Sequence, residues 1–193
     1  MKKLSIALLV LPLAGCLSFG AEPPESLLSL TADQQVAVGQ PQSSANAKTV
    51  TIQVPQTPQA LATNRIPVQS GATDVSYLKN AQWVEQPARL FARLVSDTIG
   101  ARTGRVVMSG AQSLADPGAR LSGELRMFGV DAVSRNAVVT YDAALVRDDG
   151  SSLEKRRFEA RVPVATIESA PVGTALNQAA NQVAGEVADW VGR

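Results

Sequence analysis

The chain has 193 residues, with 18 Lys and Arg against 17 Asp and Glu, which gives a formal net charge of +1. This balance argues against nucleic-acid binding, which requires a concentrated basic surface. The chain contains no histidine and one cysteine, Cys16, so it lacks the commonest metal ligand and the usual general base of hydrolytic enzymes.

The N-terminus has the order of a secretory signal. Two lysines precede the apolar run Leu4–Leu13, and two small residues then lead to Cys16. The run is too short for a transmembrane helix, which needs ~20 apolar residues. The order Leu13-Ala14-Gly15-Cys16 resembles the lipobox of a bacterial lipoprotein precursor. The resemblance implies that residues 1–15 are a lipoprotein signal peptide and that Cys16 is the lipid attachment site.

An alternative is an ordinary secreted protein in which Cys16 has no special role. An unpaired cysteine is unusual in an oxidising compartment, which favours the lipoprotein. Residues 16–25 contain Gly20 and the pair Pro23-Pro24, and we interpret them as a lipidated tether. We expect residues 26–193 to form one domain, which has no further cysteine and therefore depends on packing and strand pairing for its stability.

Strand signals in the first half of this domain are short. The apolar run over residues 26–31 predicts a first strand. Residues 49–54 alternate polar and β-branched side chains and end at a proline, which predicts a second strand. Further prolines predict an extended crossing of the surface over residues 55–74, in which Ile66-Pro67-Val68 forms a short edge strand.

A helix is predicted from Pro87, because the missing N–H of proline suits a first-turn position. Its apolar residues recur at helical spacing, and either Gly100 or Gly104 can end it. Arg105–Met108 then predicts a short strand. The apolar face of the helix is formed by Leu90, Phe91, Leu94, Val95 and Ile99.

Three longer strands are predicted next, the first and the last of them from side-chain alternation with period two. Ala119–Asp131 alternates until Phe128 and Val130 appear on the polar side, which indicates either a bulge or burial of both faces near the end of the strand. Residues 136–146 are apolar on both faces and predict a central strand. The sequence Asp148-Asp149-Gly150 predicts a hairpin turn into a last strand over residues 152–164.

The last element is a helix in which Ser169 is the expected N-cap and Pro171 lies in the first turn. One apolar stripe and many alanines favour close packing on a sheet over a coiled coil. We therefore predict an α+β fold, mainly an antiparallel sheet with two helices packed on one face, in a single domain. The stripe comprises Leu176, Ala180, Val183, Val187 and Trp190.

No motif for catalysis or metal binding appears along the chain. There is no G-x-S-x-G elbow and no glycine-rich phosphate loop, and a lipid on Cys16 would leave no thiol nucleophile. The pair Asp148-Asp149 fits a hairpin turn better than a cation site, and Lys155-Arg156-Arg157 fits a solvated strand better than a lipid headgroup site. We predict no enzymatic activity, no metal and no cofactor apart from the covalent lipid on Cys16, such as palmitate.

Aromatic residues make up only 4% of the chain, yet Tyr77 and Trp83 both lie in the segment that leads into the first helix. Two interpretations of these residues stay open. They cap the hydrophobic core, or they anchor a partner at an interface, since Tyr and Trp are typical interface anchors.

The same segment carries a resemblance to a known family. The spacing Tyr77-x5-Trp83-x-Glu85-x-Pro87, followed by a helix and a strand-rich half that ends in a second helix, is similar to the ABC-type transport auxiliary lipoproteins over most of residues 26–193. The resemblance implies a docking component that works with a mammalian-cell-entry (MCE) protein and ABC transporter subunits to move lipid between the two membranes of Gram-negative cells. It implies an anchor in the outer membrane on the periplasmic face, in keeping with Leu17 rather than an aspartate after the cysteine, and it allows a homo-oligomeric ring.

Two other functions stay open. A helix-covered sheet can open an apolar pocket, so the chain could be a periplasmic module that binds lipid itself. It could instead be a structural lipoprotein of the cell envelope. Co-purification with MCE and ABC subunits would favour docking, whereas stoichiometric lipid in the purified domain would favour lipid binding.

Overall fold

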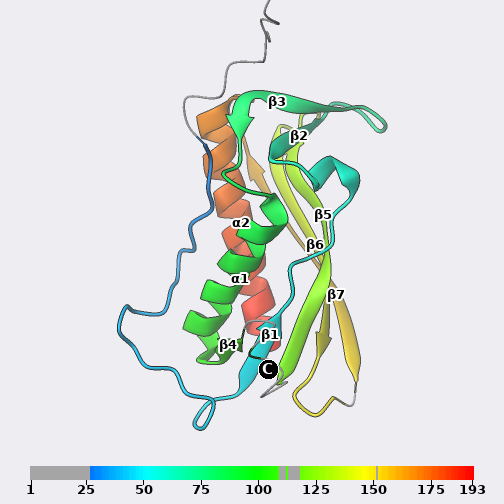
Figure 1. Ribbon diagram of the computed structural model, residues 1–193. Coiled ribbons are helices and arrows are strands. Elements are labelled where there is room, and N and C mark those ends of the chain that lie inside the picture. The colour runs from blue at the N-terminus through cyan, green and yellow to red at the C-terminus, as the bar shows by residue number, and fades with distance from the viewer. Residues whose placement is uncertain (1–26, 109–111, 113–117, 151) are drawn as a thin grey trace, which may run out of the picture.

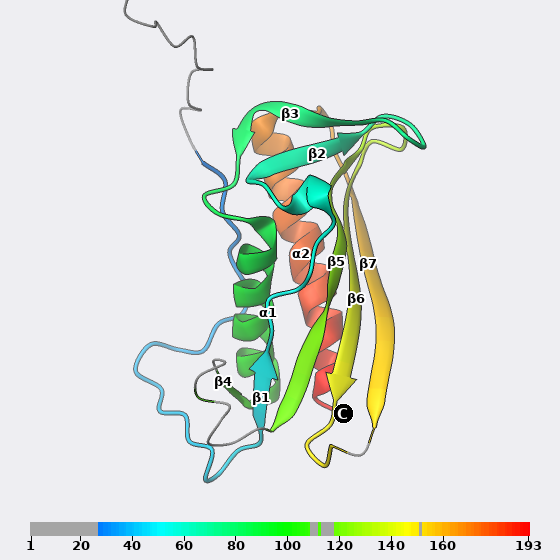
Figure 2. The same cartoon turned by 45° about the vertical axis from the view of Figure 1, so that its right-hand side comes forward.

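A computed structural model describes residues 27–108, 112, 118–150 and 152–193. The expected signal peptide, Cys16 and the tether to residue 25 lie outside these residues. The described chain forms two layers, a seven-stranded sheet and two helices that cover one of its faces (Figures 1 and 2). The position of both helices on one face confirms that part of the predicted fold.

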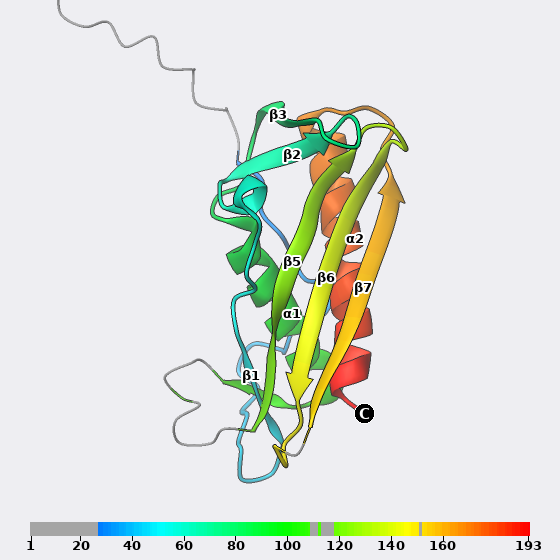
Figure 3. The same cartoon turned by 90° about the vertical axis from the view of Figure 1, so that its right-hand side faces the viewer.

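Three long antiparallel strands form the main part of the sheet (Figure 3). They are β5 (Ala119–Asp131), β6 (Asn136–Val146) and β7 (Leu153–Pro163), and each lies where the sequence predicts it. β6 is central between β5 and β7, as its two apolar faces predict. The ladder between β5 and β6 shifts register after Leu125, which confirms a bulge, and residues 128–130 are buried in succession, so both faces of β5 are also buried near its end.

Four short strands extend the sheet on the other side of β5. β1 (Thr49–Ile52) pairs in parallel with the start of β5, and β4 (Val106–Met108) pairs in parallel with β1. β2 (Arg65–Gln69) pairs in parallel with the end of β5, and β3 (Val75–Gln82) forms a hairpin with β2. A short 3-10 helix, Gln59–Leu61, lies between β1 and β2 in the chain.

The sheet is mixed, so the prediction of a mainly antiparallel sheet is wrong. The pairings β1–β4, β1–β5 and β2–β5 are all parallel. A parallel pair needs a long connection between its strands, and the β2–β3 hairpin followed by α1 supplies that connection between β1 and β4. Side-chain alternation predicts where a strand lies, but it contains no information about the direction of the neighbouring strand.

The β2–β3 hairpin also departs from the sequence prediction. β2 is not an edge strand, because it lies between β3 and β5. β3 is a strand in a segment where the sequence predicts none. The polar pair Lys79-Asn80 interrupts its alternation, and Asn80 adopts a φ of 54°, which few residues other than glycine tolerate as well as asparagine does.

The helices α1 (Pro87–Thr103) and α2 (Ser169–Val191) confirm the two predicted helices. α1 begins at the predicted proline and ends before Gly104, whose φ of 68° forms a left-handed C-cap. The N-cap of α2 is Glu168, and no side chain caps it. Ser169 is therefore the first helical residue rather than the cap, so that detail of the prediction is wrong.

Aromatic rings join the helices to the sheet. Phe91 of α1 lies edge-on to Tyr141 of β6 with ring centroids 5.2 Å apart, and Trp190 of α2 lies 5.6 Å from Phe158 of β7. These four side chains and the predicted apolar stripe of α2 are buried. The space between the two layers is thus filled by side chains. Neither helix within the described ranges has the length and apolar character needed to span a bilayer.

Candidate functional site

The first described residues form a strap across the helical layer. We define the N-terminal strap as Leu27–Asp33, the blue segment at the start of the described chain (Figure 1). Two asparagines one helical turn apart on α2 bind its backbone. The Thr31 N–H donates to Asn177 Oδ1 at 2.9 Å, and the Asp33 N–H donates to Asn181 Oδ1 at 2.8 Å. Asn181 Nδ2 also donates to the Thr31 carbonyl at 2.9 Å, so the contact uses the backbone of the strap.

The strap enters the sheet at Leu28, and the strand predicted over residues 26–31 is reduced to this single bridge. The Leu28 N–H donates to the Gln82 carbonyl and the Val84 N–H donates to the Leu28 carbonyl, both at 2.8 Å, on either side of Trp83. The Leu28 side chain covers Gly173 of α2, where an added Cβ would lie 2.9 Å from Leu28 Cδ2. The missing side chain at Gly173 lets the strap lie close to the helix.

Trp83 lies in the core beside the strap. Its exposed fraction is 0%, and its ring is 5.4 Å from the ring of Phe128. The indole Nε1 has no hydrogen-bond partner among the described residues. For Trp83 the structure therefore supports the core interpretation, because in this conformation the side chain offers no surface to a partner.

Tyr77 differs from Trp83, and the structure does not bring the two into one surface. The side chain is half-buried, its hydroxyl donates to the Ala60 carbonyl at 3.4 Å, and the Arg65 guanidinium lies 4.3 Å from the ring centroid. Tyr77 lines a groove of about 410 Å³ between β3 and the start of α2. It therefore stays a candidate interface residue.

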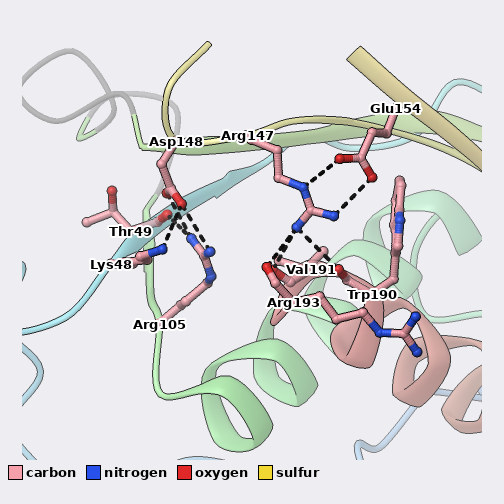
Figure 4. A network of polar contacts seen from close by, with 9 residues as sticks. All are labelled: Lys48, Thr49, Arg105, Arg147, Asp148, Glu154, Trp190, Val191 and Arg193. Carbon is pink, nitrogen blue, oxygen red and sulfur yellow. Dashed lines mark hydrogen bonds and ion pairs between the residues drawn. The ribbon is translucent and has the colours of Figure 1, made fainter. Parts of the chain in front are cut away.

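A polar network lies at the opposite end of the molecule, where β1, β4 and the β6–β7 turn meet (Figure 4). Arg105 is buried, and its guanidinium donates to the two carboxylate oxygens of Asp148 at 2.9 and 3.1 Å and to the Thr49 carbonyl at 3.1 Å. Hydrogen bonds and charge from Arg105 hold the pKa of Asp148 below its usual range, against the opposing effect of partial burial. The predicted turn is confirmed, because the Gly150 N–H donates to the Arg147 carbonyl at 2.9 Å and Gly150 has a φ of 66°.

Arg147 connects this turn to the end of α2 (Figure 4). Its guanidinium donates to the carboxylate oxygens of Glu154 at 2.8 and 2.9 Å. Its Nη1 also donates to the carbonyls of Trp190 and Arg193 at 3.4 and 3.2 Å. A cation at this position compensates the carbonyl dipoles at the end of a helix. The network therefore fixes this end of the fold, a role the sequence analysis missed because it assigned Asp148 to the turn alone.

The sheet face away from the helices carries an open groove of about 770 Å³, lined by small residues such as Ser122 and Ala144 and by polar and charged residues such as Gln56 and Lys155. Arg157 at its rim donates to the Asp142 carboxylate at 2.6 and 2.7 Å. Arg156 lies over the Phe158 ring, 4.9 Å from its centroid. These contacts agree with the prediction of a solvated strand. No group of three or more His, Cys, Asp or Glu side chains in the described ranges is arranged to hold a metal ion.

Replacement of Asn181 by alanine is expected to release the strap. Asn181 is 9% exposed and makes three hydrogen bonds, two of them to the strap. Their loss leaves partly buried backbone groups unpaired, at a cost of about 1–3 kcal/mol. Hydrogen exchange at the Asp33 amide should accelerate in Asn181→Ala. Asn177→Ala is the control and should have the smaller effect, because it removes one exposed bond to the strap; an unchanged Asp33 amide in Asn181→Ala would contradict the prediction.

Comparison with known proteins identifies a matching family model and structures of similar fold. The model of a family described as "ABC-type transport auxiliary lipoprotein component" matches residues 28–188. No curated protein gives a significant match. A crystal structure of a DUF330 family protein from Xanthomonas campestris is similar, with a TM-score of 0.69 at 18% identity over 86% of this chain and 94% of that one. The crystal structure of an uncharacterized protein has a TM-score of 0.64 at 14% identity over 84% of this chain and 99% of that one.

Proposed function

Because the chain belongs to the family of ABC-type transport auxiliary lipoprotein components, we propose that it is the membrane-anchored docking component of an ABC-type lipid transport system. The proposed partners are an MCE protein and the ABC transporter subunits. A homo-oligomeric ring is one arrangement in which the chain would present a continuous docking surface to them.

The proposed anchor is a lipid on Cys16 in the outer membrane, with the domain on the periplasmic face. The family is one of lipoproteins, and Leu17 rather than an aspartate follows the cysteine. The segment from Cys16 to Leu27 spans at most ~40 Å when fully extended, so this segment would hold the domain near the bilayer. Several acyl chains give a firm anchor where a single chain binds only weakly.

The packing between the sheet and the helices favours docking over lipid binding by the domain itself. A lipid carrier needs an apolar cavity that encloses most of its ligand. Here aromatic side chains fill the space between the layers, with ring centroids 5.2 and 5.6 Å apart. The groove of about 770 Å³ is open and has charged residues such as Arg157 at its rim. Because exposing an acyl chain to water costs ~25 cal/mol per Å², an enclosed route would have to be built together with the partners.

We also propose that the chain is not an enzyme. It has no histidine, and Cys16 is its only cysteine. The buried Arg105 binds the Asp148 carboxylate and the Thr49 carbonyl, and these contacts hold β1, the start of β4 and the β6–β7 turn together. This structural role explains why these charged residues are present, so no catalytic role is needed to account for them.

The anchor is tested by Cys16→Ser. We expect this variant to lose labelling by a fatty-acid probe, to accumulate as the precursor and to leave the outer-membrane fraction. Ser18→Ala, two residues further on, is the matched control and should keep all three properties. Labelling of the Cys16→Ser chain at the level of the control would contradict the lipid attachment site.

Docking is tested by purification of the tagged, lipidated chain from membranes, followed by identification of the bound proteins and lipids. We expect an MCE protein and ABC subunits to co-purify, and no stoichiometric lipid beyond the covalent anchor. Stoichiometric free lipid on a chain without protein partners would overturn docking in favour of lipid binding by the domain.

A further inference from the structure

We propose that one end of the domain, formed by the β2–β3 hairpin, the β5–β6 turn and the start of the strap, lies against the phospholipid bilayer that holds the anchor. The proposal rests on the anchor at Cys16 and adds to it an orientation and a contact surface. The opposite end, with the polar network, would then be left free for protein partners.

The described chain starts at this end of the molecule. Leu28 forms its bridge beside Trp83, just after β3. Figures 1 and 2 show the strap starting next to β3 and the first turns of α2, and then running toward the other end. Since at most ~40 Å of chain separates Cys16 from Leu27, the bilayer is nearest to this end.

Two exposed valines at this end lie in or directly beside neighbouring turns. Val75 at the start of β3 is 54% exposed, and Val133 in the β5–β6 turn is 75% exposed. The turns are neighbours, because Gln69 pairs with Val75 in one and with Asp131 in the other. Apolar side chains at adjacent turns can enter the boundary between headgroups and acyl chains, about 5–10 Å deep.

A second apolar pair lies where the strap begins. Leu27 is 52% exposed and Val84 is 49% exposed, and the Val84 N–H donates to the Leu28 carbonyl. β3 runs between this pair and the two turns, and among the described strands it has β2 as its only neighbour. Tyr77 and Lys79 of β3 are residue types that favour the boundary between hydrocarbon and water.

Charge at this end is nearly balanced. Exposed Lys79 and Arg135 are offset by acidic residues such as Asp74, and Arg161 lies 3.5 Å from Asp131. Attraction to anionic headgroups is therefore weak, and the contact depends on apolar side chains. Binding of this kind is insensitive to salt, in contrast to binding through a basic surface.

Single cysteines test the orientation, because Cys16 carries the lipid and a cysteine placed elsewhere is the one free thiol. Val75→Cys, Val133→Cys and the control Leu153→Cys, at the opposite end and 58% exposed, are labelled with an environment-sensitive fluorophore. The full lipidated chain is reconstituted in vesicles of phosphatidylethanolamine and phosphatidylglycerol, with and without acyl-brominated lipid. We expect a blue shift and quenching at positions 75 and 133, unchanged by added salt, and neither effect at position 153.

A second set of variants separates contact from mere proximity. In a Thr73→Cys background, Val75→Asp with Val133→Asp should abolish quenching, whereas Val54→Asp, at another exposed valine, should leave it unchanged. Flotation of the vesicles reports on the anchor independently. Three results with a chain that floats would overturn this proposal alone. They are no quenching at positions 75 and 133, equal quenching at positions 75, 133 and 153, and quenching that is lost when salt is added. A chain that fails to float overturns the anchor and this proposal with it.

Discussion

Replacement of Trp83 by alanine is expected to lower the free energy of unfolding by about 3–5 kcal/mol. Trp83 is completely buried, with its ring 5.4 Å from that of Phe128, and the Phe128 ring lies 6.4 Å from Phe91 of α1. Removal of the indole leaves a cavity where β3, the strap and the first helix meet. Urea denaturation followed by circular dichroism measures the loss, and the transition should move to lower urea with the slope unchanged.

Trp83→Phe is the matched control for this experiment. The indole Nε1 has no hydrogen-bond partner among the described residues, so its loss removes no contact that the structure shows. The phenyl ring keeps most of the buried apolar area, and the cost should be clearly smaller than for alanine. An alanine variant with wild-type stability that fails to bind partners would contradict the core role of Trp83 and would mean that the side chain turns outward in the assembly.

The elements with the strongest periodicity were predictable from the sequence. The strands β5 and β7 and both helices have a buried stripe that recurs with period two or period 3.6, and β6 is a largely apolar run, so each is identified without knowledge of its neighbours. The bulge after Leu125 was predictable for the same reason, because Phe128 leaves the alternating pattern where the register shifts.

Contacts between distant segments were not predictable. Asn177 and Asn181 look like ordinary polar residues on a helix, and their partners in the strap are separated from them by 146 and 148 residues. Val75–Gln82 lacks clear alternation, and it is a strand because β2 offers it a hydrogen-bonding edge. Such pairings depend on which distant segments lie side by side in the folded chain, and a local sequence pattern contains no information about this.

A second large loss of stability is expected in the polar network where β1, β4 and the β6–β7 turn meet. Replacement of Asp148 by asparagine is expected to cost about 2–3 kcal/mol, because it leaves the Arg105 guanidinium without its carboxylate. The Arg105 side chain is 6% exposed and that of Asp148 is 33% exposed, so the cost is lower than for a fully buried pair. Asp189→Asn is the matched control, because it breaks an ion pair that is more exposed: the side chain of Arg102 is 35% exposed and that of Asp189 is 53% exposed. The loss of this pair should lower the free energy of unfolding by at most about 1 kcal/mol.

The contribution of Asp148 should also depend on pH in a defined direction. Its pKa is lowered in the folded chain by Arg105, whereas an unfolded aspartate titrates near its ordinary value of about 3.9. The unfolded chain therefore binds the proton first as the pH falls, and the stabilisation is complete above the unfolded pKa and disappears as the pH falls through the folded pKa. The difference in unfolding free energy between the wild type and Asp148→Asn should be constant near neutral pH and shrink in acid. A difference that stays constant through the acidic range would show that the stabilisation comes from packing around the Asp148 side chain, because only the ionised carboxylate can supply a contribution that titrates.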